Sequence, residues 1–183
     1  LSEPLGYWNA LAIFAALGVL LALGLAARTH VHWVRALAAA TLVPLALVIY
    51  FTFSRGGWIA LGIGLAAAIA LDRRRVSLVT WAVPLLAWPA VAIWVASSRD
   101  ALTTVDAPLA RAVDQGSAVA LVAIGCLLGA AVTAVALGLA ETRLAISGRV
   151  VRSYSIGLAV LAVAVLLGIF VRFGAPWTIA DRG

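Results

Sequence analysis

One arginine stands apart from the rest of a strongly apolar chain. Arg55 lies within the stretch Phe51-Thr52-Phe53-Ser54-Arg55-Gly56-Gly57-Trp58, between two long apolar runs. A guanidinium keeps its charge and offers a planar fork of N–H donors that matches a phosphate or diphosphate. The glycine pair after it would let a ligand or another backbone come close. The pattern favours either a bound anion at Arg55 or an arginine at a helix end that extends to lipid headgroups.

Few other side chains have types and spacings that suggest chemistry. His30 and His32 are two positions apart, and no third ligand stands near them, so we expect no metal site. The aspartates between residues 97 and 116 are more typical of solvated loop acids than of acid–base groups. The single Cys126 lies in an apolar run, where a thiol usually serves packing. The sequence predicts no metal and no other cofactor, and we assign no catalytic residue within it.

The elements that must position Arg55 are membrane helices. The chain is 65% hydrophobic and 11% charged, whereas soluble domains have about 25% charged residues. A helix needs about 20 apolar residues to cross the hydrocarbon core of a bilayer. We therefore predict an all-α, polytopic transmembrane helix bundle in contact with the lipid bilayer. Its six spans cover residues 10–27, 36–53, 58–71, 77–96, 117–140 and 154–171.

The connections between the predicted spans, and a glycine pair in the fifth span, add detail to this prediction. Residues 1–183 are treated as a single transmembrane domain, and residues 54–57 are read as the turn into the third span. Residues 97–116 form the longest polar connection. Gly125 and Gly129 have the spacing of a small-residue face that another helix could approach, although this spacing also arises by chance in a segment rich in alanine and glycine.

The arginines predict which connections lie in the cytoplasm. The net charge is +6, and all 13 basic residues are arginines gathered near the ends of apolar runs, so a nucleic-acid partner is not expected. Alternate connections at residues 28–35, 73–75 and 141–152 hold eight arginines, against five in the other set. Cytoplasmic connections carry the excess of positive residues. Both ends of the chain, and Arg55 with them, are therefore expected to face outward.

Two motifs together resemble a known family. Pro4-Leu5-Gly6-Tyr7-Trp8-Asn9 opens the first span, and Phe51-Thr52-Phe53-Ser54-Arg55-Gly56-Gly57-Trp58 leads into the third. In this order they resemble the O-antigen ligase and O-antigen polymerase family, in which a proline–glycine–asparagine stretch opens one helix and a threonine–any–serine–arginine–glycine stretch opens another. The resemblance is clear over residues 4–75 and only topological beyond them.

The resemblance implies an enzyme of the bacterial cytoplasmic (inner) membrane that acts in lipopolysaccharide or cell-surface polysaccharide biosynthesis. Such glycosyltransferases move a glycan from a polyprenyl-diphosphate carrier to a sugar hydroxyl of an acceptor glycan or lipid, without a metal. Arg55 would contact the carrier's diphosphate, with Ser54, Gly56 and Gly57 in support. Gly6 and Asn9 would be structural.

The chain also departs from the family pattern. Family members place a further arginine and a histidine, the general base, in or beside a large outward loop. Residues 173–183 resemble the start of such a loop, and neither histidine of this chain is expected outside. We therefore expect a fragment that holds the donor-binding part and lacks the general base. The alternative is a membrane transporter or a non-catalytic polytopic protein.

Overall fold

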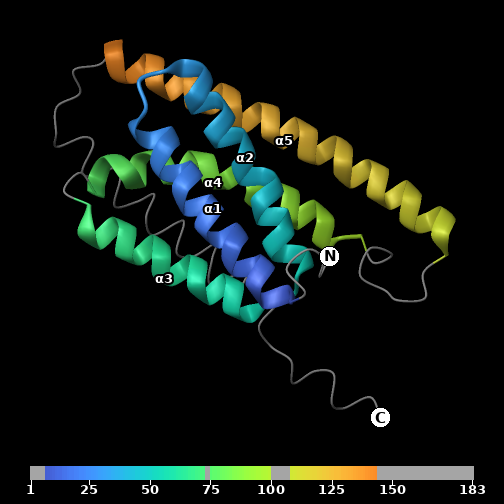
Figure 1. Cartoon of the computed structure of the whole chain (residues 1–183). Coiled ribbons are helices and arrows are strands. Elements are labelled where there is room, and N and C mark those ends of the chain that lie inside the picture. Colours follow the sequence, from blue (N-terminus) through green and yellow to red (C-terminus); the bar gives the residue numbers. More distant parts are fainter. Residues whose placement is uncertain (1–6, 73–74, 100–107, 144–183) are drawn as a thin grey trace.

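The computed structural model describes residues 7–72, 75–99 and 108–143, which form five α-helices (Figure 1). These are α1 Trp8–Arg28, α2 His32–Phe51, α3 Arg55–Leu71, α4 Arg75–Ser97 and α5 Leu109–Arg143. The described residues contain no β-strand, which confirms the all-helical class. Helices α1, α2, α4 and α5 are each long and apolar enough to cross a membrane, and α3 is a shorter apolar helix of 17 residues. The fold is that of a multi-pass membrane protein.

Successive helices run in opposite directions, so the bundle has two ends (Figure 1). One end holds the start of α1, the α2–α3 turn, the end of α4 and the start of α5; we call it the Arg55 end. The other holds the α1–α2 connection, the ends of α3 and α5 and the start of α4; we call it the Arg28 end. An up-and-down arrangement is the one that short connections between neighbouring helices produce.

Helix α2 lies at the centre of the bundle. It packs most extensively against α1 and α5 and also contacts α4. Helix α3 is held chiefly by α1, with a smaller contact to α4. Only one residue of α3, Gly57, is buried, so this helix lies at the edge of the described bundle.

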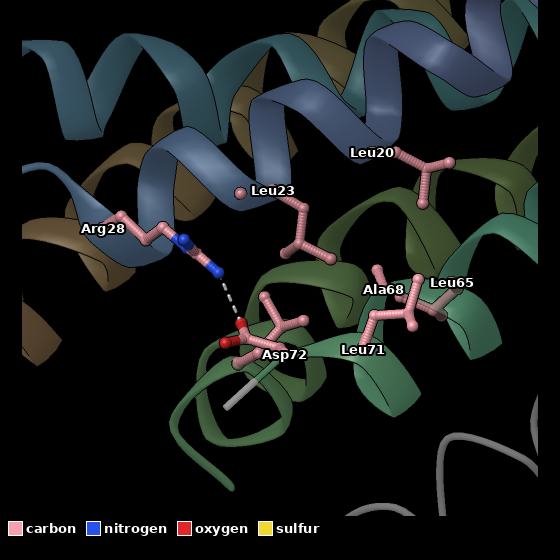
Figure 2. Close-up of a pocket in the computed structure, with 9 residues that line it drawn as sticks. Leu20, Leu23, Arg28, Leu65, Ala68, Leu71 and Asp72 are labelled. Atoms are coloured by element: carbon pink, nitrogen blue, oxygen red, sulfur yellow. Dashed lines mark hydrogen bonds and ion pairs between the residues drawn. The ribbon is translucent and has the colours of Figure 1, made fainter. Parts of the chain in front are cut away.

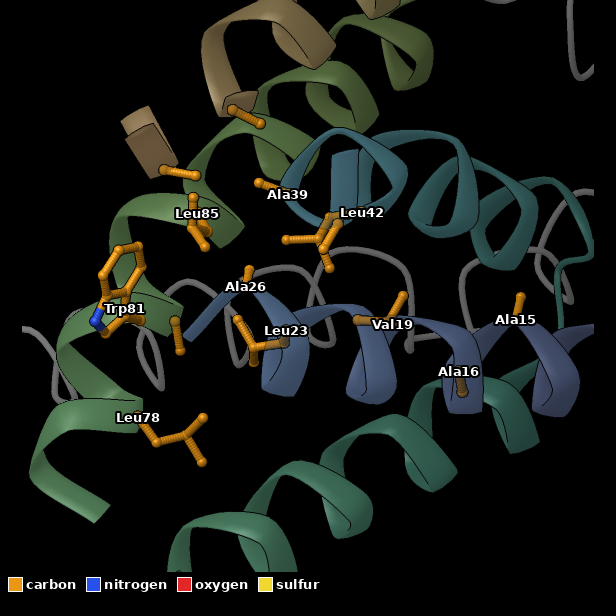
Figure 3. Packing of buried hydrophobic residues seen from close by; sticks show 14 of the residues in the cluster. Ala15, Ala16, Val19, Leu23, Ala26, Ala39, Leu42, Leu78, Trp81 and Leu85 are labelled. Carbon is orange, nitrogen blue, oxygen red and sulfur yellow. The ribbon is translucent and has the colours of Figure 1, made fainter. Parts of the chain in front are cut away.

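The core between α1, α2 and α4 combines a few large side chains with many alanines (Figure 3). Trp81, Leu23, Leu42 and Leu85 are among the largest fully buried side chains. The same buried cluster contains many alanines, some of them from α5: Ala15, Ala16, Ala26, Ala39, Ala130 and Ala134. Small residues let helix backbones approach closely, and van der Waals contact at close range is a main source of helix association in lipid.

The predicted glycine face of the fifth span is divided in the structure. A Cβ on Gly129 would lie 2.5 Å from the ring of Trp88 in α4, whereas a Cβ on Gly125 would meet nothing within 4 Å. The indole Nε1 of Trp88 also donates a 3.0 Å hydrogen bond to Oγ1 of Thr133. Gly129 is therefore used for packing within the chain, between α4 and α5.

Several helix boundaries differ from the predicted spans. Helix α3 begins at Arg55, so the glycine pair lies inside its first turn, where a connecting turn was predicted. Helix α5 begins at Leu109, so the end of the predicted polar connection 97–116 is helical. Hydropathy locates apolar residues, but a helix end is set by capping and backbone hydrogen bonds, such as that from Arg111 N to Pro108 O. The predicted sixth span 154–171 and residues 173–183 lie outside the described residues, as does Gly6.

Candidate functional site

A hydrogen bond joins the start of α1 to the start of α3. The hydroxyl of Ser54 donates to Oδ1 of Asn9 over 2.6 Å. The Nδ2 group of Asn9 donates in turn to the phenolic oxygen of Tyr7 over 2.9 Å. Asn9 and Ser54 belong to the two separate motifs of the sequence, so the fold brings these motifs together at the Arg55 end.

Ser54 is the N-cap of α3. Its backbone is extended, and its Oγ accepts a 3.1 Å hydrogen bond from the backbone N–H of Gly57. Serine is among the preferred N-cap residues because its side chain satisfies an N–H that the first turn leaves without a helical partner. Ser54 is only 3% exposed. Its hydroxyl therefore donates to α1 and accepts from α3, which fixes the position of the cap.

Close packing of Gly57 against Ala12 brings the two helices together beside this hydrogen bond. A Cβ on Gly57 would lie 2.6 Å from the Cβ of Ala12, closer than two carbon atoms can approach. The neighbouring Gly56 is different, because a Cβ there would meet only Oγ of Ser54, at 3.7 Å. Gly57 thus serves helix packing, whereas a side chain at Gly56 would make only an ordinary contact.

The turn before the cap is tight. Phe53 has a φ of 50°, in the left-handed region that bulky residues rarely adopt. Its backbone N–H donates to the carbonyl of Tyr50 over 3.1 Å, and the hydroxyl of Thr52 donates to the carbonyl of Ile49 over 2.7 Å. The chain therefore reverses direction within Thr52, Phe53 and Ser54. A left-handed residue of this kind costs of the order of 1–3 kcal/mol and is held in place by its surroundings.

Arg55 is the first residue of α3, and its side chain is exposed. Among the described residues it makes no hydrogen bond and no ion pair. The first turn of α3 contains no acidic residue. The N-terminus of a helix carries partial positive charge, so a cation there is unfavourable unless an anion approaches. The arrangement is thus electrostatically complementary to an anion.

Backbone donors add to this positive site. The first N–H groups of a helix lack helical acceptors. In α3, Gly57 N is satisfied by Ser54 Oγ and Trp58 N by Ser54 O, which leaves the N–H groups of Arg55 and Gly56. Gly56 is exposed and carries no side chain that would cover them. A guanidinium with adjacent backbone N–H groups at a helix N-terminus can bind a phosphate or diphosphate.

Sequence reasoning missed a second arginine, at the Arg28 end. Arg35 was assigned to the basic connection 28–35, but it lies inside α2 and is only 4% exposed. Its Nη2 donates to the carbonyl of Thr29, and its guanidinium lies 4.4 Å from the ring centroid of Trp81. The side chain also passes directly over Gly138 of α5. The sequence did contain a sign of this burial, because Arg35 has helical spacing to the buried residues Ala38, Ala39 and Leu42.

The two histidines and the cysteine of the sequence lie away from Arg55. His30 and His32 are exposed at the Arg28 end, far along the bundle from Arg55. In residues 7–72, 75–99 and 108–143, no group of three or more histidine, cysteine or acidic side chains could hold a metal ion. Cys126 is buried between α2, α4 and α5.

The fold and the site define a class: a multi-pass helical membrane protein with an exposed arginine at a tightly capped helix start. Comparison of the chain with protein-family models, curated proteins and solved structures finds no match.

Proposed function

We propose that this chain is the carrier-binding part of a glycan transferase of the O-antigen ligase or polymerase type. The substrate would be a polyprenyl-diphosphate-linked glycan at the outer face of the bacterial cytoplasmic membrane. The observation that carries the proposal is Arg55, exposed and without a polar partner in the described part of the chain, at the positive end of α3. The hydrogen bond between Asn9 and Ser54 supports it, because it unites the two motifs of the resemblance.

The chemistry assigned to Arg55 is stabilisation of a leaving group. In the transfer, the acceptor hydroxyl oxygen forms a bond to the anomeric carbon while the bond from that carbon to the carrier's diphosphate breaks. Negative charge then grows on the diphosphate oxygen. A preorganised cation and N–H donors stabilise such developing charge without the need to reorganise solvent. The proton of the hydroxyl passes to a base, which the resemblance assigns to the large outward loop.

Fixed geometry is what makes an arginine effective in this role. Arg55 directly follows Ser54, whose hydroxyl is held from two sides. The backbone of Arg55 is therefore anchored while its side chain is exposed. The guanidinium is thus free to form two parallel hydrogen bonds to one phosphate group.

The test is complementation with the full-length gene in a host that lacks the equivalent ligase or polymerase. Arg55→Ala and Arg55→Lys should both lose glycan transfer, since an ammonium supplies charge without the planar fork of donors. The matched control is Arg111→Ala, an exposed arginine near the start of α5 at the same end. Undiminished glycan transfer by both Arg55 variants would contradict the proposal. So would a full-length protein that transports a solute in an Arg55-dependent way and transfers no glycan.

A binding measurement separates the role of Arg55 from effects on expression. The purified full-length protein in detergent should bind farnesyl diphosphate, and Arg55→Ala should weaken this binding by about tenfold or more, as expected for loss of a charge-assisted contact. Farnesol, which lacks the diphosphate, should bind the unaltered protein and the Arg55→Ala variant with equal affinity. Equal affinity of the two proteins for farnesyl diphosphate would rule out the assigned contact.

A further inference from the structure

A cavity of about 280 Å³ lies between α1 and α3 near the Arg28 end (Figure 2). The two helices touch at Gly57 and Ala12 and again at Gly64, against which Leu20 packs. Beyond that contact they are separated by the cavity, and Leu78 of α4 forms part of its wall. Its apolar lining is made of Leu20, Leu23, Leu65, Ala68, Leu71 and Leu78.

An ion pair stands at one end of this apolar cavity. Nη2 of Arg28 lies 2.7 Å from Oδ2 of Asp72 (Figure 2). The two side chains differ sharply in exposure, at 69% for Arg28 and 9% for Asp72. The carboxylate is therefore largely covered, while the guanidinium extends outward with N–H donors to spare. The rim of the cavity thus presents guanidinium N–H donors of Arg28.

We propose that this cavity is a binding site for an anionic phospholipid, with one acyl chain between α1 and α3 and the phosphate on Arg28. The apolar lining excludes a charged or strongly polar occupant from the interior, since unpaired polar groups are costly there. The cavity volume, about 280 Å³, lies just below the range of about 300–1,000 Å³ for ligand pockets, so it suits a segment of one acyl chain. The site lies at the opposite end of the bundle from Arg55, and it does not depend on the proposed glycan transfer.

Charge complementarity selects the headgroup. Arg28 uses one donor on Asp72, so its remaining donors can bind phosphate oxygens. In the sequence, Asp72 is followed directly by three further basic residues, Arg73-Arg74-Arg75. Basic residues beside the ends of membrane helices attract anionic lipids by about 1 kcal/mol each. A zwitterionic headgroup would bring its own cation next to Arg28 and would therefore bind less favourably.

The experiment measures lipid retained by the purified full-length protein. Nanodiscs of equal parts dioleoyl phosphatidylglycerol and dioleoyl phosphatidylcholine are dissolved in detergent, and native mass spectrometry counts each lipid bound to the protein. Arg28→Gln should lower retained phosphatidylglycerol about fivefold, with phosphatidylcholine unchanged, as expected for loss of one arginine–headgroup contact. Arg28→Lys should keep most of the retained phosphatidylglycerol. Ala68→Leu, which fills the cavity, should lower the retained phosphatidylglycerol as well.

The matched control is Gly62→Leu, on α3, where an added side chain meets open space. It should retain phosphatidylglycerol like the unaltered protein. Equal retention by Arg28→Gln, Ala68→Leu and Gly62→Leu would overturn the proposal. Displacement of the lipid by free glycerol 3-phosphate would also overturn it, because the site would then recognise a phosphate without the chain.

Discussion

Oγ of Ser54 and Oδ1 of Asn9 lie 2.6 Å apart, although one caps α3 and the other belongs to the first turn of α1. This hydrogen bond has a clear direction, because the amide oxygen of Asn9 can only accept, so Ser54 donates its only proton to Asn9 while its oxygen accepts from Gly57 N. Arg55 follows Ser54 in the chain. The side chain of Asn9 therefore helps to set where the start of α3, and with it Arg55, lies against α1.

Replacement of Asn9 by alanine should destabilise the protein. Asn9→Ala removes the acceptor of the buried Ser54 hydroxyl, which costs about 1–3 kcal/mol in the free energy of unfolding. Asn9→Asp keeps an acceptor near the N-terminus of α1, where negative charge is favourable, and should cost less. Unfolding by SDS in mixed micelles measures both, and equal losses for the two variants would argue against a role for the acceptor.

The two glycines after Arg55 should respond oppositely to alanine. Gly57→Ala places a methyl group against Ala12 and should destabilise by about 1–3 kcal/mol. Gly56→Ala makes only an ordinary contact with Oγ of Ser54 and should be neutral or stabilising by up to about 1 kcal/mol, since alanine favours helix. The double variant Gly57→Ala, Ala12→Gly should recover part of the loss. Without such recovery in the same SDS titration, the assigned contact is wrong.

A similar contrast is expected along α5. Gly129→Ala should disturb the ring of Trp88 and its hydrogen bond to Thr133, at a cost of about 1–3 kcal/mol. Gly125→Ala has nothing nearby and should leave stability unchanged. Thermal unfolding in detergent, followed by circular dichroism, compares the two. A larger effect at Gly125 would instead favour a helix–helix contact on the open face of α5.

Two arginines at the same end of the bundle should differ in their effect on stability. Arg35→Ala removes a buried guanidinium from the carbonyl of Thr29 and the ring of Trp81, and should cost about 3 kcal/mol or more. Arg28→Ala removes an ion pair whose arginine is largely exposed, and should cost no more than about 1 kcal/mol. SDS titration gives both values, and a cost for Arg28→Ala equal to that for Arg35→Ala would contradict the difference in burial.

The two ends of the bundle should lie on opposite sides of the membrane. In a Cys126→Ala background, a membrane-impermeant thiol reagent applied from outside should label Ser98→Cys, at the Arg55 end, and not His30→Cys. Both positions are exposed in the structure. Permeabilised cells provide the control, since both variants should then be labelled. Labelling of His30→Cys alone from outside would show that the orientation is the reverse of the predicted one.

Much of the fold follows from composition and run length. Apolar runs long enough to cross a bilayer predicted the helices, because in lipid a backbone must satisfy its own hydrogen bonds. The ends of those helices were predicted less well. Hydropathy did not show that Arg55 is helical or that α5 begins at Leu109, since Ser54 Oγ and Pro108 O set these starts through hydrogen bonds.

The sequence by itself determined that this is a helical membrane protein and that Arg55 is a cation out of place among apolar residues. Only the tertiary structure decided that Asn9 positions Ser54, that Gly57 and not Gly56 is needed for packing, and that Arg35 is buried beside Trp81. The physical reason is that each of these relationships joins residues on different helices. Spacing along one helix shows which residues share a face, but not which residue of another helix lies opposite.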